Sequence, residues 1–405
     1  MPIAISQPGP AREPGMPILP LLATLAVQTL ATMALYSMPT LAPAVARDLQ
    51  VNGALVGGFV ATAYGVGIVS ALLSPGLIRR YGGVRTTQAV LLAAAGMLAI
   101  AASSLGITGL ACAAIVLGSG YGAAAPASTH LLVPHTPRSI FNLVMSLRQI
   151  GVPLGGVFAA LVLPPLVPVL GWRGALLIEL VPVFLLIIGM ELPRRAWDAD
   201  RDPLVRPWGR TLLQPFILLR DRRILRLSAS CFIYSGLQLC FVAFTTVHLT
   251  TVVGFNLIRA GQMLAVYQFA GSISRPIWGW VADRHLTPTQ TLGVHGIGMT
   301  MAAALAAQFG AGWSVVAVLG VVLLAGCTAG GYTGVAYAEY ASLGGARRTE
   351  ATGLGTALMF SGGLLLPPLF GASVAFLGGY EVTYRAFAVL ALGSAVLMWW
   401  PPVRR

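Results

Sequence analysis

Charged residues are scarce in this chain. Only 9% of its 405 residues are Asp, Glu, Lys or Arg, whereas 57% are hydrophobic. Soluble globular domains carry charge on about a quarter of their residues, so this composition excludes an ordinary soluble protein and favours a membrane protein. Lysine is absent altogether, and all 25 basic residues are therefore arginine.

Short motifs of common enzyme chemistry are missing as well. The chain contains no HExxH, no GxSxG and no phosphate-binding loop, so the sequence does not support an enzyme. The few cysteines fall within apolar stretches and form no CxxC pair: Cys112, Cys231, Cys240 and Cys327. We expect them to be packing residues, and we expect no disulfide, metal site or cofactor.

Twelve long apolar runs recur along the chain. Each approaches the ~20 residues that a helix needs to cross the ~30 Å hydrocarbon layer. Strands of a membrane barrel would instead be ~10 residues of alternating polarity, so the runs predict an all-α membrane protein. The spans are expected at residues 17–44, 53–78, 86–107, 109–133, 140–166, 172–191, 224–252, 260–282, 290–310, 313–338, 351–377 and 383–401.

A polar linker at residues 192–223 divides the chain near its middle. The segments 17–191 and 224–401 on either side are each expected to hold six helices. Residues 1–16 and 402–405 are expected to be short tails, and the first tail lacks the features of a secretion signal.

Short matches between the two halves indicate an internal repeat. "LIRRYGG" at 77–83 corresponds to "VADRHLT" at 281–287, and "GYGAAA" at 120–125 corresponds to "GYTGVA" at 331–336. Repeated halves are typical of secondary transporters.

The net charge of +13 is distributed unevenly over the predicted loops. If the first residues are cytosolic, the cytosolic segments hold most of the arginines, and the opposite face has only Arg47, Arg173, Arg259 and Arg385. The positive-inside rule then predicts that both termini and the linker face the cytosol, with the protein in the inner membrane. This placement accounts for the basic excess without a nucleic-acid partner.

Several of these features resemble the major facilitator superfamily. "GWVADR", Gly279 to Arg284, is similar to the family's loop signature after the eighth helix, and "GWRGA" at 171–175 resembles the usual opening of the sixth. The resemblance implies two pseudo-symmetric six-helix bundles that rock about a central cavity. It also implies gating roles for Gly279, Asp283 and Arg284. After the second helix, Arg79, next to Arg80, replaces the family's aspartate, so these two are gating candidates of reversed charge.

One arginine lies inside an apolar run. Arg275 is eight residues before Asp283, which places it ~12 Å up the helix, and burying its charge costs ~2.5 kcal/mol or more without a partner. Gln268 and Ser272 share its helical face. "RPIWG" at 275–279 resembles the Arg-Pro-x-x-Gly of the monocarboxylate transporter branch, where the arginine meets the substrate carboxylate. The alternative is a structural arginine that pairs within the bundle or snorkels.

Further binding candidates come from the other spans. Arg148 in the fifth span is expected at a depth similar to that of Arg275, unless it lies at the cytosolic mouth. Tyr121 and Tyr332 occupy corresponding places in the repeat and offer hydroxyl donors, although each is equally expected as a packing aromatic. The weaker candidates, which nothing separates from ordinary polar packing, are Gln28, Tyr36, Tyr234 and Gln238.

These residues lead to a functional hypothesis with an alternative. The hypothesis is a secondary active transporter of a small organic anion, a monocarboxylate, that works by alternating access as a monomer. Proton coupling is left open, because Glu179 is the one acidic residue well inside a span and is expected to be structural. The alternative is an exporter of hydrophobic or cationic compounds, a drug:proton antiporter. A non-transporting receptor would be expected to carry a soluble output domain.

Overall fold

A computed structural model describes residues 15–50, 54–103, 105–207 and 213–399, and every regular element in these ranges is helical. The first half of the chain forms α1 (Ile18–Leu49), α2 (Ala54–Tyr81), α3 (Gly83–Ala102), α4 (Gly106–Tyr121), α5 (Ala124–Leu132), η1 (Val133–His135), η2 (Arg138–Ile140), α6 (Phe141–Gln149), α7 (Gly151–Ile178) and α8 (Leu180–Gly189). The second half forms α10 (Arg222–His248), η4 (Leu249–Val253), α11 (Leu257–Arg284), α12 (Pro288–Ala306), α13 (Val315–Ala329), α14 (Thr333–Gly344), η5 (Gly345–Arg347), α15 (Arg348–Phe376) and α16 (Tyr380–Trp399). Two short helices, α9 (Arg194–Trp197) and η3 (Gln214–Arg220), lie between the halves in the sequence.

All twelve predicted spans fall on helical segments, and several consist of two helices. The fourth is α4 with α5, the fifth begins with α6 and continues into α7, and the tenth is α13 with α14. Inside α7, Gly171 adopts a φ of 68°, a left-handed conformation that a side chain disfavours, so the chain reverses there into the sixth span. The all-helical prediction is therefore confirmed.

Length and composition alone identify fewer spans in the described residues. Eight helical stretches are long and apolar enough to cross a membrane, and two of them, 138–189 and 315–376, each contain two predicted spans. Neither α11 nor α12 is among the eight. Polar residues such as Gln268, Arg275 and His295 lower the mean hydropathy of these two helices, which are still 28 and 19 residues long.

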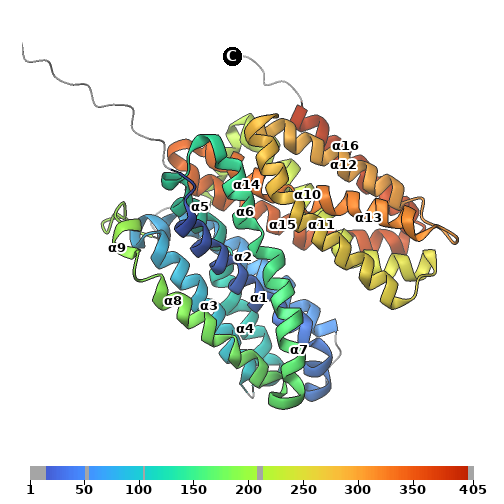
Figure 1. Ribbon diagram of the computed structural model, residues 1–405, viewed down its shortest axis with the longest axis horizontal. Coiled ribbons are helices and arrows are strands. Elements are labelled where there is room, and N and C mark those ends of the chain that lie inside the picture. Colours follow the sequence, from blue (N-terminus) through green and yellow to red (C-terminus); the bar gives the residue numbers. More distant parts are fainter. Residues whose placement is uncertain (1–14, 51–53, 104, 208–212, 400–405) are drawn as a thin grey trace, which may run out of the picture.

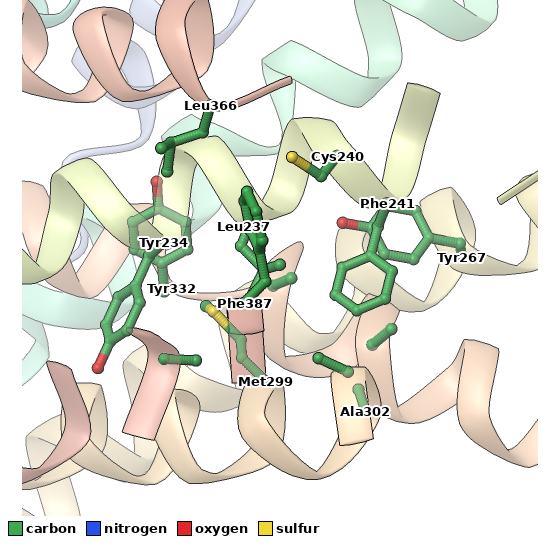
Figure 2. Close-up of a cluster of buried hydrophobic side chains, with 14 of the residues drawn as sticks. Tyr234, Leu237, Cys240, Phe241, Tyr267, Met299, Ala302, Tyr332, Leu366 and Phe387 are labelled. Carbon is green, nitrogen blue, oxygen red and sulfur yellow. The ribbon is translucent and has the colours of Figure 1, made fainter. Parts of the chain in front are cut away.

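Each half has its own hydrophobic core. In the first half, α1 packs along α7, and α3 along α4; in the second, α10 packs along α15, and α12 along α16. Figure 2 shows part of the second core, in which Phe241 of α10 lies beside Tyr267 of α11. Most core residues of each half therefore pack within that half.

The two halves meet at one end of the molecule only. Figure 1 shows α5, α6 and α14 close together there, whereas α7 and α13 diverge toward the other end. The start of α1 and the end of α16, which adjoin the tails, and the start of α10, which follows the linker, lie at the joined end, which we call the linker side. The conformation is therefore closed on the linker side.

Candidate substrate cavity and gate

A cavity of about 100 Å³ lies between the two halves. Its walls come from eight spans, four in each half, and they are mainly polar and aromatic. The principal lining residues are Gln28, Tyr36, Tyr64, Tyr121, Gln149, Ser235, Gln238, Arg275, Tyr332, Tyr337, Thr356 and Phe360. Among the described residues, no acidic side chain and no histidine lines it.

Arg275 lies in this cavity wall and joins the two halves. Its side chain is 4% exposed. Nε donates to the backbone oxygen of Gly330, between α13 and α14, at 2.9 Å, and Nη1 donates to the backbone oxygen of Gln149 in the other half. Arg275 therefore has the structural role that the sequence offered as the alternative, and it also lies in the cavity wall.

Arg148 is buried completely, directly beside the cavity. Its Nη2 donates to Oε1 of Gln28 at 2.7 Å, and its guanidinium carbon lies 5.6 Å from the ring centre of Tyr337. Both of these neighbours line the cavity. Within the described ranges, Nε and Nη1 of Arg148 have no hydrogen-bond partner. The structure thus places Arg148 at depth, next to the residue whose carbonyl Arg275 binds.

Neither arginine has an acidic partner within 4.0 Å in the part of the chain that the structure describes. Backbone carbonyls accept hydrogen bonds from the Arg275 guanidinium, and an amide oxygen and an aromatic ring contact the Arg148 guanidinium. These groups are neutral, so they do not cancel either positive charge. Buried charge without a counterion costs several kcal/mol, and natural proteins tolerate such groups mainly at functional sites. The cavity therefore has the electrostatic character of a site for an anion.

An aromatic wall completes the cavity. Tyr64 of α2, Tyr121 of α4 and Phe360 of α15 form one cluster, in which the rings of Tyr121 and Phe360 are stacked at 5.7 Å and Tyr64 meets Phe360 edge-on at 4.7 Å. The hydroxyls of Tyr121 and Thr32 are hydrogen-bonded at 3.2 Å. Because Phe360 belongs to the second half, this wall also crosses the interface between the halves.

The other sequence candidates divide into two groups. Tyr332, Gln28, Tyr36 and Gln238 line the cavity and stay candidates for substrate binding. Tyr234 does not: its hydroxyl donates to the backbone oxygen of Leu292 at 3.1 Å within the second core, where its ring meets that of Tyr332 (Figure 2). Gln268 and Ser272 share the face of α11 that carries Arg275, but they lie farther from the linker side and outside the described cavity.

Sequence reasoning missed six of these principal lining residues: the aromatic Tyr64, Tyr337 and Phe360 and the polar Gln149, Ser235 and Thr356. Aromatic residues in apolar spans give the same pattern whether they pack or line a cavity, so no signal separated them. Glu179 lies away from the cavity lining, 3% exposed, and accepts a hydrogen bond from Ser37 at 2.5 Å.

On the linker side, Asp283 connects α11 to the start of α6. Its carboxylate accepts hydrogen bonds from the backbone N–H groups of Asn142 and Leu143 at 3.0 and 2.9 Å, and from the Asn142 side chain at 2.8 Å. A carboxylate at a helix N-terminus is stabilised by the free N–H groups and the helix dipole. Asp283 therefore holds the two halves together at this end.

Two glycines permit the close contact. A Cβ on Gly279 would lie 2.7 Å from the backbone oxygen of Asn142, and one on Gly334 would lie 2.3 Å from Cα of Ser146. Any side chain at these positions would push α11 or α14 away from α6. In contrast, Arg284 is exposed.

At the end of α2, the position that corresponds to the Asp283 contact holds a basic residue, Arg79, instead of an acidic one. Arg79 Nη1 lies 3.4 Å from Oε1 of Glu350 in the first turn of α15, and Arg347 Nε binds the other carboxylate oxygen at 2.7 Å. Arg79 thus reaches the second half, as an aspartate would, but through an ion pair. Arg80 points elsewhere: its Nη1 donates to the backbone oxygen of Val205.

We expect Arg79→Glu to weaken closure on the linker side, because it places two carboxylates against each other. The loss of an exposed ion pair is worth about 1 kcal/mol, or roughly fivefold in the ratio of closed to open conformers. Uptake rates in proteoliposomes should fall accordingly. Arg80→Glu makes the same charge change without touching α15 and should transport at nearly the original rate. Equal effects of both variants would contradict the pairing.

The linker is attached to the first half. The Asp198 carboxylate accepts hydrogen bonds from the backbone N–H groups of Val84 and Arg85 at the start of α3, at 2.7 and 3.3 Å. Burial raises the pKa of Asp198, although these N–H groups lower it. Asp200 pairs with His130 at 3.0 Å. These contacts therefore hold the linker against the first half.

Helices in two halves, a charged cavity between them and a polar contact closing one end are the features of a membrane transporter. The model of the Major Facilitator Superfamily matches residues 21–367, and the chain belongs to this family. It is accordingly a secondary transporter and not an enzyme.

Among known sequences, the chain is similar to 4-hydroxybenzoate transporters named PcaK. It is 27% identical over 293 residues to the one from Pseudomonas aeruginosa and 25% identical over 293 residues to that from Pseudomonas putida. Each match covers 64% of this chain and 64% of the relative, so it spans less than two thirds of either.

Solved structures share the fold at low identity. The human organic anion transporter MFSD10 (TETRAN) superposes with a TM-score of 0.75 at 15% identity and covers 94% of this chain and 99% of its own. The transporter FucP, in its outward conformation, gives 0.71 at 14% identity and covers 94% of this chain and 98% of its own. At these identities the likeness concerns the fold alone.

Proposed function

We propose that this protein transports a small aromatic carboxylate across the inner membrane, and that Arg275 and Arg148 bind the carboxylate. The observation that carries the proposal is the pair of buried guanidinium groups with no acidic partner in the described structure. A carboxylate ligand would supply the missing counterion. It would also accept hydrogen bonds from the Arg148 N–H groups that have no partner in the described structure.

The aromatic part of the proposal rests on the wall of Tyr64, Tyr121 and Phe360. Aromatic rings favour stacked or edge-on neighbours, each worth about 0.5–1.5 kcal/mol beyond simple burial. A ligand with an aromatic ring can therefore use this wall while its carboxylate meets the arginines. The similarity to 4-hydroxybenzoate transporters supports the same substrate class.

An exporter of cationic compounds is the competing function. Such a site needs a carboxylate or another acceptor of positive charge in the cavity. Among the described residues the lining contains none, and Arg275 in the wall, with Arg148 beside it, would repel a cation. The electrostatics therefore favour the anion.

Replacing Phe360 by leucine tests the substrate class. Leucine keeps an apolar side chain but removes the ring, so apparent affinity for benzoate-type acids should fall about 2- to 10-fold. Aliphatic acids of similar charge should be little affected. Uptake of labelled 4-hydroxybenzoate and of a short aliphatic carboxylate into proteoliposomes measures both.

Phe269→Leu provides the matched control, since Phe269 is 67% exposed on α11, outside the cavity. An equal loss for aromatic and aliphatic acids in Phe360→Leu would show that the ring serves packing alone and would remove the aromatic part of the proposal.

We propose further that the linker side faces the cytosol, as the distribution of arginines predicts. The conformation described above would then be closed to the cytosol. A cysteine introduced at Arg201, which is exposed on the linker, should resist membrane-impermeant reagents in intact cells. Ready labelling from outside would reverse the orientation.

A further inference from the structure

A second cavity lies within the second half, on the linker side. Its volume is about 780 Å³, and it shares no lining residue with the central cavity. It opens between the ends of four helices: the start of α10, the start of α12, the end of α14 and the end of α16. We call it the linker-side pocket.

The walls of this pocket are mainly apolar. They consist of aliphatic and sulfur-containing side chains from all four helices: Leu227, Leu286, Leu292, Val294, Leu343, Leu397 and Met398. Some of these face outward as well, since Leu397 is 40% exposed. An apolar wall that continues onto the outer surface of a membrane helix suits a hydrocarbon chain.

The polar end of the pocket is positively charged overall. Arg223 and Arg226 of α10 line it, and Glu339 of α14 is the acidic residue among its described lining. The Glu339 carboxylate already accepts a hydrogen bond from the Thr289 hydroxyl at 3.2 Å. Two guanidinium groups against one carboxylate leave a net positive site.

Trp399 marks the level of the pocket in the membrane. Its indole Nε1 donates to the backbone oxygen of Gln290 at 3.2 Å, and the ring lies over Gly293, where a Cβ would be 1.9 Å from that nitrogen. The side chain is nevertheless 52% exposed. Tryptophans with one hydrogen-bonded edge and one apolar face concentrate at the boundary between lipid tails and headgroups.

We propose that the linker-side pocket binds one phospholipid with an anionic headgroup. Its phosphate would lie against Arg223 and Arg226, and an acyl chain would lie along Leu343, Leu397 and Met398. Arginine binds phosphate oxygens through several N–H groups at once, and basic pockets between helix ends on the cytoplasmic side recognise anionic headgroups. The bound lipid would join α10, α14 and α16, and so stabilise the second half.

The test uses the full-length protein in detergent, with thermal unfolding followed as lipid is added. Phosphatidylglycerol should raise the unfolding midpoint at least twice as much as phosphatidylcholine with the same acyl chains. Arg223→Gln should abolish this difference. Arg222→Gln, one residue away, exposed and outside the pocket lining, should preserve it.

Three outcomes would overturn the proposal. Equal shifts with the two lipids would show that headgroup charge is not recognised. A difference that survives in Arg223→Gln would place the lipid elsewhere. If glycerol phosphate without acyl chains reproduces the whole effect, the occupant is a soluble anion and not a lipid.

Discussion

Replacing Arg275 by glutamine is expected to abolish uptake of the carboxylate substrate. Truncating one partner of a buried charged contact costs about 2–5 kcal/mol, which corresponds to roughly 30-fold or more in affinity. Arg275→Lys should fail as well, because an ammonium group cannot donate in the fork geometry that reaches Gly330, Gln149 and a ligand at once. Uptake of labelled 4-hydroxybenzoate into proteoliposomes measures both variants.

The control for this experiment lies on the same helix. Arg259→Gln makes an identical change at the far end of α11, where the side chain is exposed, and should transport normally. Arg275 also binds two backbone carbonyls and so contributes to folding. Uptake is therefore compared only between variants that have similar unfolding midpoints and reconstitute in equal amounts. Normal uptake by well-folded Arg275→Gln would remove the anion site from the account.

Arg148→Met should separate stability from function. The substitution removes a fully buried charge with two N–H groups that have no partner in the described structure, and it keeps a long side chain in the same space. Relief of that desolvation is worth about 1–4 kcal/mol, as for buried ion pairs replaced by apolar groups. The ligand-free variant should therefore unfold at a higher temperature than the original protein.

Transport should change in the opposite direction. If Arg148 binds the ligand, Arg148→Met should lower uptake more than tenfold although the variant is more stable. This is the result expected when a functional group destabilises the protein. Thermal unfolding and uptake are measured on the same preparation. A variant that is less stable and still transports would show that Arg148 is structural.

Charged residues in apolar spans are the site candidates that stand out most clearly in the sequence. Arg275, Arg148 and Asp283 stand out because burying charge in a membrane is costly, and the structure places each at a contact between the halves. The partners are a different matter. Glu350 meets Arg79 only because α15 packs against α2, which no local pattern in either helix reveals.

Aromatic residues show the limit more clearly. The repeat makes Tyr121 a candidate. Phe360, which stacks on Tyr121, comes from the other half of the chain, and no pattern in the sequence links the two. Tyr234 and Tyr332 are both candidates from the sequence, yet the hydroxyl of Tyr234 donates to the backbone oxygen of Leu292 within the core and Tyr332 lines the cavity. Which face of a helix meets the cavity depends on packing between halves, and uniformly apolar spans do not encode it.

Ligand charge provides the most direct test of the central claim that two buried arginines bind an organic anion. Thermal unfolding of the purified protein is measured with benzoate, with neutral benzamide and with cationic benzylamine, which share ring size and differ in charge. The account predicts stabilisation by benzoate alone, about 2.7 kcal/mol at 100 times its Kd, and its loss in Arg275→Gln. Stabilisation by benzylamine and not by benzoate would contradict the account and favour the cation exporter.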